Sequence, residues 1–140
     1  MLQYFTISEL LVSATADRLG LSNDPPRWVV HNLEELIRRI LDPLRLLFGE
    51  PIIVNSGYRS IPVNNAVGGV ATSQHLKGQA ADIRGRTATA TRRLWQLAKD
   101  SGLPFDQLIN ECPGSDGTPT WVHISWAANP RGQVLTLGKR

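Results

Sequence analysis

The sequence predicts an α+β fold, with a small, mostly antiparallel sheet flanked by helices. Apolar residues recur at three- and four-residue spacing in the first third of the chain, whereas the last third holds short segments of alternating apolar and polar residues. These are the periods of an amphipathic helix and of a half-buried strand. Helices followed by strands, without regular alternation, are typical of the α+β class.

Length and composition indicate one folded domain over residues 1–140. The chain has 41% hydrophobic and 19% charged residues, and a domain of this size buries a core without cross-links. The single cysteine, Cys112, excludes an intramolecular disulfide. No apolar run approaches the roughly 20 residues that span a bilayer. We expect a monomer without a membrane span.

The charges do not indicate a nucleic-acid partner. The net charge is +3, and Lys and Arg are scattered along the chain apart from the pairs at 38–39 and 92–93, both in helical segments. Neither a helix-turn-helix pattern nor a basic run is present, so nucleic-acid binding is not expected. The N-terminus lacks a basic region and carries Glu9 within its apolar stretch. We therefore expect no secretory signal, and we expect the protein to be synthesised in the cytoplasm.

The helical part begins with a short lead-in over residues 1–24, of which "ISELL" is the clearest piece. A long helix follows in "SNDPPRWVVHNLEELIRRILDPLRLLFGEP", with Asp24 as its N-cap and the prolines at 25 and 26 in its first turn. Pro43 is expected to kink or break this helix, and Gly49 to end it. The predicted buried stripe consists of Val30, Leu33, Ile37, Ile40, Leu41 and Leu44.

The middle of the chain alternates between short strands and loops. "PIIVNSGYRS" is predicted as a strand that runs into a turn, residues 61–78 as an irregular loop and "QAADI" as a short strand. The next predicted helix lies in "TATATRRLWQLAKDSGL", residues 87–103, with Thr87 or Thr89 as its N-cap and Gly102 at its end. "FDQLINE" and "TWVHISW" are predicted to pair across the turn "CPGSDGTP", and "QVLTL" is the last strand.

Three residues form a candidate metal site. The chain has three histidines. His75 lies seven residues before Asp82 in a Gly- and Ala-rich segment, and His123 lies on a predicted strand. His31 lies on the long helix, where a surface or packing role is expected. Two histidines and one aspartate suit a zinc ion whose fourth position is left for water. Composition alone does not establish this, because such a set occurs by chance in many domains.

Four segments in order, "SGYRS", "SQHLKGQAADI", "FDQLINE" and "WVHISW", resemble the zinc D-Ala-D-Ala carboxypeptidase family of murein peptidases (LAS metallopeptidases). The family signature is S-x-H-x6-D followed by a late histidine. The wider group includes phage endolysins, and the hedgehog signalling domain shares the fold. The resemblance covers nearly the whole chain. It implies a small sheet flanked by helices, with one zinc ion in a groove across one sheet face.

The resemblance also assigns roles to individual residues. His75, Asp82 and His123 match the three zinc ligands. Arg59 matches an arginine that contacts the substrate, and Ser73 a serine near the substrate. From the residues alone, a loop ion pair is the favoured role of Arg59, whereas Ser73 is equally compatible with a residue that caps the loop backbone.

The proton carrier is the position at which this chain departs from the family pattern. Many members have an acidic residue three positions before the last histidine, where this chain has Thr120. Others have a glutamate at the end of the preceding strand, which makes Glu111 the match, with Asp116 in reserve. A register with Glu111 opposite His123 would put both on one sheet face. The other face of the sheet would then hold the predicted core residues Leu108, Val122, Ile124 and Trp126.

The resemblance implies a zinc metallopeptidase that hydrolyses peptidoglycan stem peptides, as a D-Ala-D-Ala carboxypeptidase or as an endopeptidase of the endolysin type. The alternative is a zinc-binding or phage structural module on the same fold without catalysis. A phage or prophage product released to the cell wall fits these expectations, and so does an intracellular enzyme that acts on wall fragments.

Overall fold

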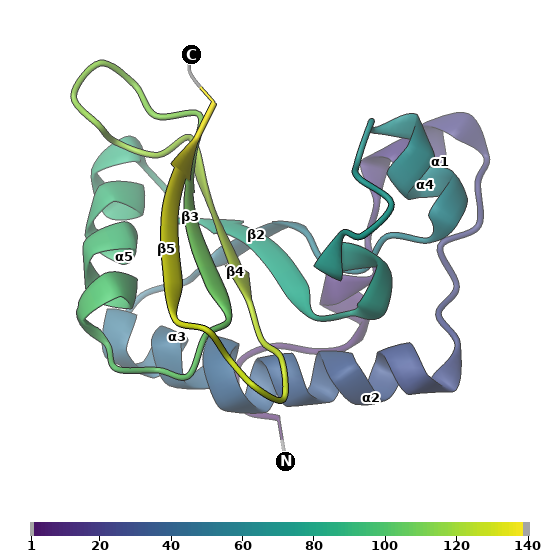
Figure 1. Cartoon of the computed structure of the whole chain (residues 1–140), viewed down its shortest axis with the longest axis horizontal. Helices are drawn as coiled ribbons and strands as arrows, with labels where there is room; N and C mark the ends of the chain where they lie inside the picture. Colours follow the sequence, from purple (N-terminus) through teal and green to yellow (C-terminus); the bar gives the residue numbers. More distant parts are fainter. Residues whose placement is uncertain (1, 139–140) are drawn as a thin grey trace.

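The computed structural model describes residues 2–138 and contains a five-stranded sheet with helices around it (Figure 1). The strand order is β1-β2-β4-β3-β5. The α+β class predicted from the sequence is therefore confirmed. The strands are β1 (Ile53–Ser56), β2 (Ala80–Arg84), β3 (Gln107–Glu111), β4 (Trp121–Ser125) and β5 (Gln133–Leu137).

The strand pairings are mixed in direction. β1 with β2, β2 with β4, and β4 with β3 are antiparallel, whereas β5 is parallel to β3. The sequence predicted the last strand but not its parallel pairing with β3. Both edges of β4 are already paired, with β2 and with β3, so the chain that leaves β4 adds its next strand at the free edge of β3.

Helices surround this sheet and make up most of the first half of the chain. They are η1 (Ser8–Leu10), α1 (Ala14–Leu19), α2 (Arg27–Leu36), η2 (Ile37–Leu41), α3 (Asp42–Phe48), α4 (Ile61–Ala66), η3 (Gln74–Lys77) and α5 (Ala88–Asp100). In Figure 1, α2 and α3 run beneath the sheet, and α1 and α4 lie together at the end of the molecule opposite α5. Within residues 2–138, the helices are too short or too polar to cross a bilayer.

The long predicted helix is continuous from Arg27 to Phe48, but it contains a π-helical stretch, η2, which ends two residues before Pro43. Proline lacks the N–H that an α-helix needs at this point, and a widened turn absorbs the defect without breaking the helix. The N-cap residue is Pro26, so the assignment of Asp24 is wrong. Gly49 ends the helix with a φ of 78°, as predicted, because glycine adopts the left-handed conformation readily.

The segment 61–78 is not an irregular loop throughout, as was predicted. It contains α4 and the single turn η3. Ser60 caps α4 by accepting a hydrogen bond from the N–H of Val63, and Pro62 occupies the first turn, which are favourable residues at a helix start. The helix is only six residues long and lies in a polar stretch, so the apolar period that reveals longer helices is absent.

One face of the sheet packs against α2, η2, α3 and α5 to form the core. Leu108, Val122 and Ile124 are fully buried there, as predicted, whereas Trp126 is only half-buried. Five of the six residues predicted for the helical stripe are buried, but Val30 is only half-buried and its neighbour Val29 takes its place. In α5, the side chain of Thr87 caps the first turn, which decides between the two predicted caps. With these helices on one face, the opposite face of the sheet is left for a site.

Candidate functional site

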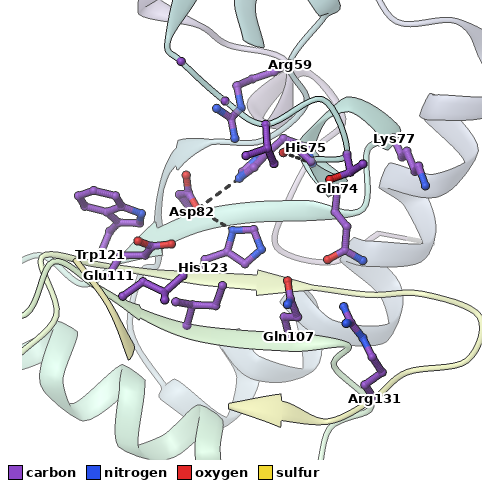
Figure 2. A pocket seen from close by; sticks show the side chains of 17 residues that line it. Arg59, Gln74, His75, Lys77, Asp82, Gln107, Glu111, Trp121, His123 and Arg131 are labelled. Atoms are coloured by element: carbon purple, nitrogen blue, oxygen red, sulfur yellow. Dashed lines mark hydrogen bonds and ion pairs between the residues drawn. The ribbon is translucent and has the colours of Figure 1, made fainter. Parts of the chain in front are cut away.

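The two histidines and the aspartate predicted as metal ligands lie side by side (Figure 2). Asp82 Oδ1 is 3.4 Å from His75 Nε2 and 3.2 Å from His123 Nδ1. The two imidazole rings meet edge to face, with their centroids 5.1 Å apart. One ligand atom from each of the three residues lies within 4.8 Å of the others, so a single ion can contact all three.

Sheet register and a tight turn produce this arrangement. Asp82 on β2 is paired directly with His123 on β4, and directly opposed residues share a sheet face. His75 comes from η3, which ends at Gly78 with a φ of 71°. A Cβ built on Gly78 would lie 2.8 Å from the carbonyl oxygen of Val29. Only glycine therefore lets η3 turn and pack this closely on α2.

The protonation of His75 is determined by its second ring nitrogen. His75 Nδ1 is 2.7 Å from the carbonyl oxygen of Gly57, and a carbonyl only accepts, so Nδ1 carries the proton. Nε2 faces Asp82, and in the neutral ring this nitrogen offers its lone pair to a cation. The ring is 2% exposed. A backbone acceptor behind a buried imidazole is the arrangement that orients histidine ligands in metal sites.

The charge state of the cluster suits a divalent cation. Burial disfavours ionisation of Asp82, but hydrogen bonds from His123 and His75 and their charges outweigh it and hold the pKa of this carboxyl well below its usual value. An ionised carboxylate with two imidazole nitrogens is a mixed N/O donor set of the kind found in open, catalytic zinc sites. The residues present therefore fit a zinc ion.

The cluster lies at the bottom of an open groove with a volume of about 920 Å³. The groove lies over the sheet face opposite the helical core, where Asp82, His123 and Ile109 occupy one row of paired residues. Three other residues predicted for the site, Arg59, Ser73 and Glu111, also line it. The groove can hold an extended peptide across the cluster.

Arg59 comes from the connection between β1 and α4, and its guanidinium points into the groove (Figure 2). Its Nε is buried without a hydrogen-bond partner among the described residues. None of the ion pairs within residues 2–138 involves Arg59, which disfavours the alternative of a loop ion pair. Burial lowers the pKa of Arg59, while the charge of Asp82 opposes this shift.

Gly69 leaves the space that the Arg59 guanidinium occupies. A Cβ built on Gly69 would lie 2.1 Å from Asn64 Oδ1 and 3.1 Å from Arg59 Nη1. Asn64 is buried and donates from Nδ2 to the carbonyl oxygen of Val70, at 3.0 Å. The segment that follows α4 is thereby tied down against the guanidinium. Gly69 and Asn64 were not singled out from the sequence, because their role depends on a contact with Arg59.

Ser73 does what the backbone alternative predicted, and it also lines the groove. Its Oγ accepts a hydrogen bond from the N–H of His75 at 3.2 Å and so caps η3. This contact helps to hold the histidine in place. Both readings of Ser73, as a cap and as a neighbour of the substrate, are compatible with this position.

The predicted register of Glu111 is wrong by two residues. Glu111 is paired with Trp121, and the residue opposite His123 is Ile109. The pairing closes at this point because the N–H of Thr120 donates to the carbonyl oxygen of Glu111 at 3.0 Å, and because Cys112 turns the chain with a φ of 49°. A shift by two keeps the side chain on the same face, so Glu111 still lines the groove, diagonal to His123.

The environment of Glu111 suits a group that takes up a proton. Its side chain is half-buried. Burial raises the pKa of Glu111, and the nearby carboxylate of Asp82 raises it further, while the charge of His123 opposes the shift. A carboxylate whose pKa is raised toward neutrality is a better general base.

Asp116 lies outside the groove. Its side chain is 63% exposed and 3.9 Å from Arg92 on α5. It also accepts a hydrogen bond from the N–H of Thr118 at 2.9 Å. These contacts are those of a solvated turn residue, and they leave Glu111 as the carboxylate beside the cluster.

The sequence reasoning missed a buried carboxylate at the other end of the groove. Asp106 is 3% exposed. Both its oxygens accept hydrogen bonds from the Arg131 guanidinium at 2.9 Å, and Oδ2 also accepts from Gln74 Nε2 at 2.9 Å. The network joins the β4–β5 connection to the turn that carries His75. The one available signal was an acidic residue near the start of the predicted strand segment "FDQLINE".

Asp106 should make the fold sensitive to acid. The hydrogen bonds from Arg131 are the main cause that lowers the pKa of Asp106 to about 2, against roughly 3.9 in an unfolded chain. A depressed carboxyl pKa stabilises the fold above the unfolded value, and this stabilisation is lost as pH falls from about 4 toward 2. We expect Asp106→Asn to lower the free energy of unfolding by about 2 kcal/mol at pH 7. The gap should shrink toward pH 2.

Urea unfolding of both proteins at pH 7 and near pH 2.5 measures this gap. Asp24→Asn is the matched control, because Asp24 is exposed and should change little at either pH. An equal gap at both values would show that Asp106 contributes through packing and not through its charge.

Comparisons with known proteins agree with the site. The family model described as Peptidase M15 matches residues 3–125. A curated protein, the zinc D-Ala-D-Ala carboxypeptidase of Streptomyces albus G, is 35% identical over 86 residues, which are 61% of this chain and 32% of that protein. This chain thus matches less than two thirds of the length of that relative. The resemblance inferred from the four segments is confirmed, and the chain belongs to the peptidase M15 family.

Proposed function

We propose that this protein is a zinc metallopeptidase that hydrolyses amide bonds in peptidoglycan stem peptides, with residues 1–140 as its catalytic domain. The observation that carries the proposal is the convergence of His75, Asp82 and His123 in an open groove. Family membership supports the peptidase activity, and the name of the Streptomyces albus G relative supports zinc and a D-Ala-D-Ala substrate.

In this proposal His75 Nε2, a carboxylate oxygen of Asp82 and His123 Nδ1 hold one zinc ion. When bound, zinc supplies Lewis acidity, which activates water and polarises the amide carbonyl. The protein contributes the orientation of these donors. The Gly57 carbonyl fixes one ring through Nδ1, and sheet pairing fixes Asp82 against His123.

Glu111 is the proposed proton carrier. Its carboxylate accepts a proton from the attacking water and delivers it to the amine that leaves. Its place on the groove wall and its raised pKa support this role, since a general base works best when its pKa is near the working pH.

Arg59 is the proposed substrate contact. Its guanidinium is a planar fork that can hold a terminal carboxylate or the oxygen on which negative charge develops. The unpartnered, buried Nε and the absence of a competing ion pair within residues 2–138 support this role.

Arg59→Lys is therefore expected to keep zinc and thermal stability but to lose activity by about 10²-fold or more, by analogy with oxyanion donors. Lysine retains the charge and loses the planar fork. Steady-state kinetics on a D-Ala-D-Ala peptide, with zinc content measured in parallel, tests this. Arg86→Lys, at an exposed position, is the control. Turnover close to that of the unmodified protein would assign Arg59 a structural role.

Mass spectrometry of purified sacculi, digested with and without a chelator, tests the function as a whole. Release of single D-alanine residues would identify a carboxypeptidase, and release of longer fragments an endopeptidase. A protein that retains zinc but releases no amino groups would be a zinc-binding module, which is the alternative function. We further propose that the protein is a phage or prophage product that is synthesised in the cytoplasm and then released to the cell wall.

A further inference from the structure

The two ends of the groove differ in charge (Figure 2). Glu111 and Trp121 lie at one end, and Gln107, Arg131 and Lys77 at the other, with the histidine–aspartate cluster between them. Gln107 and Glu111 are the first and last residues of β3. Four steps along a strand span about 13 Å, so each end lies about 6–7 Å from the middle row, which contains His123.

The buried carboxylate of Asp106 holds the Arg131 side chain in place. Asp106, whose side chain is 4% exposed, accepts from Arg131 Nε and Nη2 at 2.9 Å each and from the Arg131 N–H at 3.0 Å. This paired geometry fixes the plane of the guanidinium. No bond within residues 2–138 uses Arg131 Nη1, so this donor is left for a ligand in the groove. A guanidinium oriented by a buried carboxylate is pre-organised for binding.

Lys77 adds a positive charge that no ion pair among the described residues offsets. Its side chain is exposed and forms no ion pair within residues 2–138. Asp106 compensates the charge of Arg131, and the Lys77 ammonium remains. The end of the groove that holds Lys77 and Arg131 is therefore positive, and the end that holds Glu111 is negative.

We propose that the Lys77–Arg131 end is a subsite for a carboxylate of the peptide substrate, located about two residues from the bond that is cleaved. This inference rests on the proposed function and names the substrate class: an acidic peptide bound in one direction. Glu111 repels a carboxylate at the opposite end, so the two ends together select the orientation of the chain. A carboxylate on the residue next to the cleaved bond would not reach this end of the groove, since one residue spans only about 3.3 Å.

The carboxylate can be a side chain or a free C-terminus, and three peptides separate these sources. The first contains D-Ala-D-Ala with a glutamate directly before it and one glycine after it, so that the glutamate and the free C-terminus each lie on the second residue from the cleaved bond. The second has glutamine in place of glutamate, and the third has an amidated C-terminus. The zinc-loaded protein and its Lys77→Gln variant are compared at low ionic strength, where exposed charges interact most strongly. Lys99→Gln, on α5, is the matched control because it removes the same charge away from the groove.

Lys77→Gln is expected to raise KM by about 5-fold for peptides with the recognised carboxylate, the size of an exposed ion pair. It should leave kcat and zinc content unchanged and have no effect on the peptide that lacks this group. Loss of the effect with the glutamine peptide identifies a side-chain carboxylate, and loss with the amidated peptide identifies the C-terminus. The effect should fade at high salt. An equal change in KM for all three peptides, or no change, would overturn the subsite.

The subsite can be tested even if the proposed peptidase function is wrong. If the unmodified protein cleaves none of the peptides, titration of the zinc-loaded protein with each peptide still measures binding. Tighter binding of a carboxylate peptide, weakened by Lys77→Gln and not by Lys99→Gln, would support the subsite without catalysis. Equal binding of all three peptides would overturn it.

Discussion

Replacement of Asp82 or His123 by alanine should remove the zinc ion and lower the stability of the protein. Each change deletes one of three ligands whose donor atoms lie within 4.8 Å of one another. Metal binding contributes to folding free energy when the site exists only in the folded chain. A ligand present at about 100 times its dissociation constant stabilises a fold by about 2.7 kcal/mol, and this is the loss that we expect in excess zinc.

Elemental analysis of the purified variants and thermal unfolding with and without zinc measure both effects. We expect one zinc ion per chain in the unmodified protein and a small residual fraction in either variant. His31→Ala is the matched control, because the side chain of His31 is 67% exposed on α2. Normal zinc content in both ligand variants would remove the ligand assignment. Absence of zinc from the unmodified protein, even when zinc is supplied, would end the metallopeptidase proposal.

Glu111→Gln should keep zinc and stability but lose hydrolysis by 10²- to 10⁴-fold, the usual contribution of a general acid–base group. Glutamine has the same shape and cannot take up a proton. Asp116→Asn should be nearly silent, because Asp116 is exposed on the loop beside α5 and does not line the groove. These two variants change the same charge and differ in their distance from the cluster.

Single-turnover kinetics on a D-Ala-D-Ala peptide, with zinc content as the control for folding, separates the two carboxylates. Full loss of activity in Asp116→Asn while Glu111→Gln stays active would reverse the assignment. Full activity in both variants would require a different proton carrier.

The local elements of the fold could be read directly from residue patterns. Thr87 and Gly102 mark the ends of α5, and Gly49 ends the long helix. The alternation in "FDQLINE" and "TWVHISW" identified β3 and β4 together with their buried face. Caps and periodicity act over a few residues, so they are present in the sequence itself. The ligand set was inferred from spacing and from resemblance, and its three residues meet in space.

Other features depended on which segments met in three dimensions. The parallel placement of β5 and the network around Asp106 join residues far apart in the chain, and the pairing of Glu111 with Trp121 spans the connection between β3 and β4. Alternation assigns a residue to a face but leaves the register open by steps of two, since such a shift keeps every side chain on its face. Turn closure at Thr120 determines the register, and the occupied edges of β4 determine where β5 pairs. The sequence by itself thus determined the long helix, α5, the strands and the chemistry of the ligands, whereas the tertiary structure decided the pairing of the strands and the charge of each end of the groove, because these depend on contacts between separate segments.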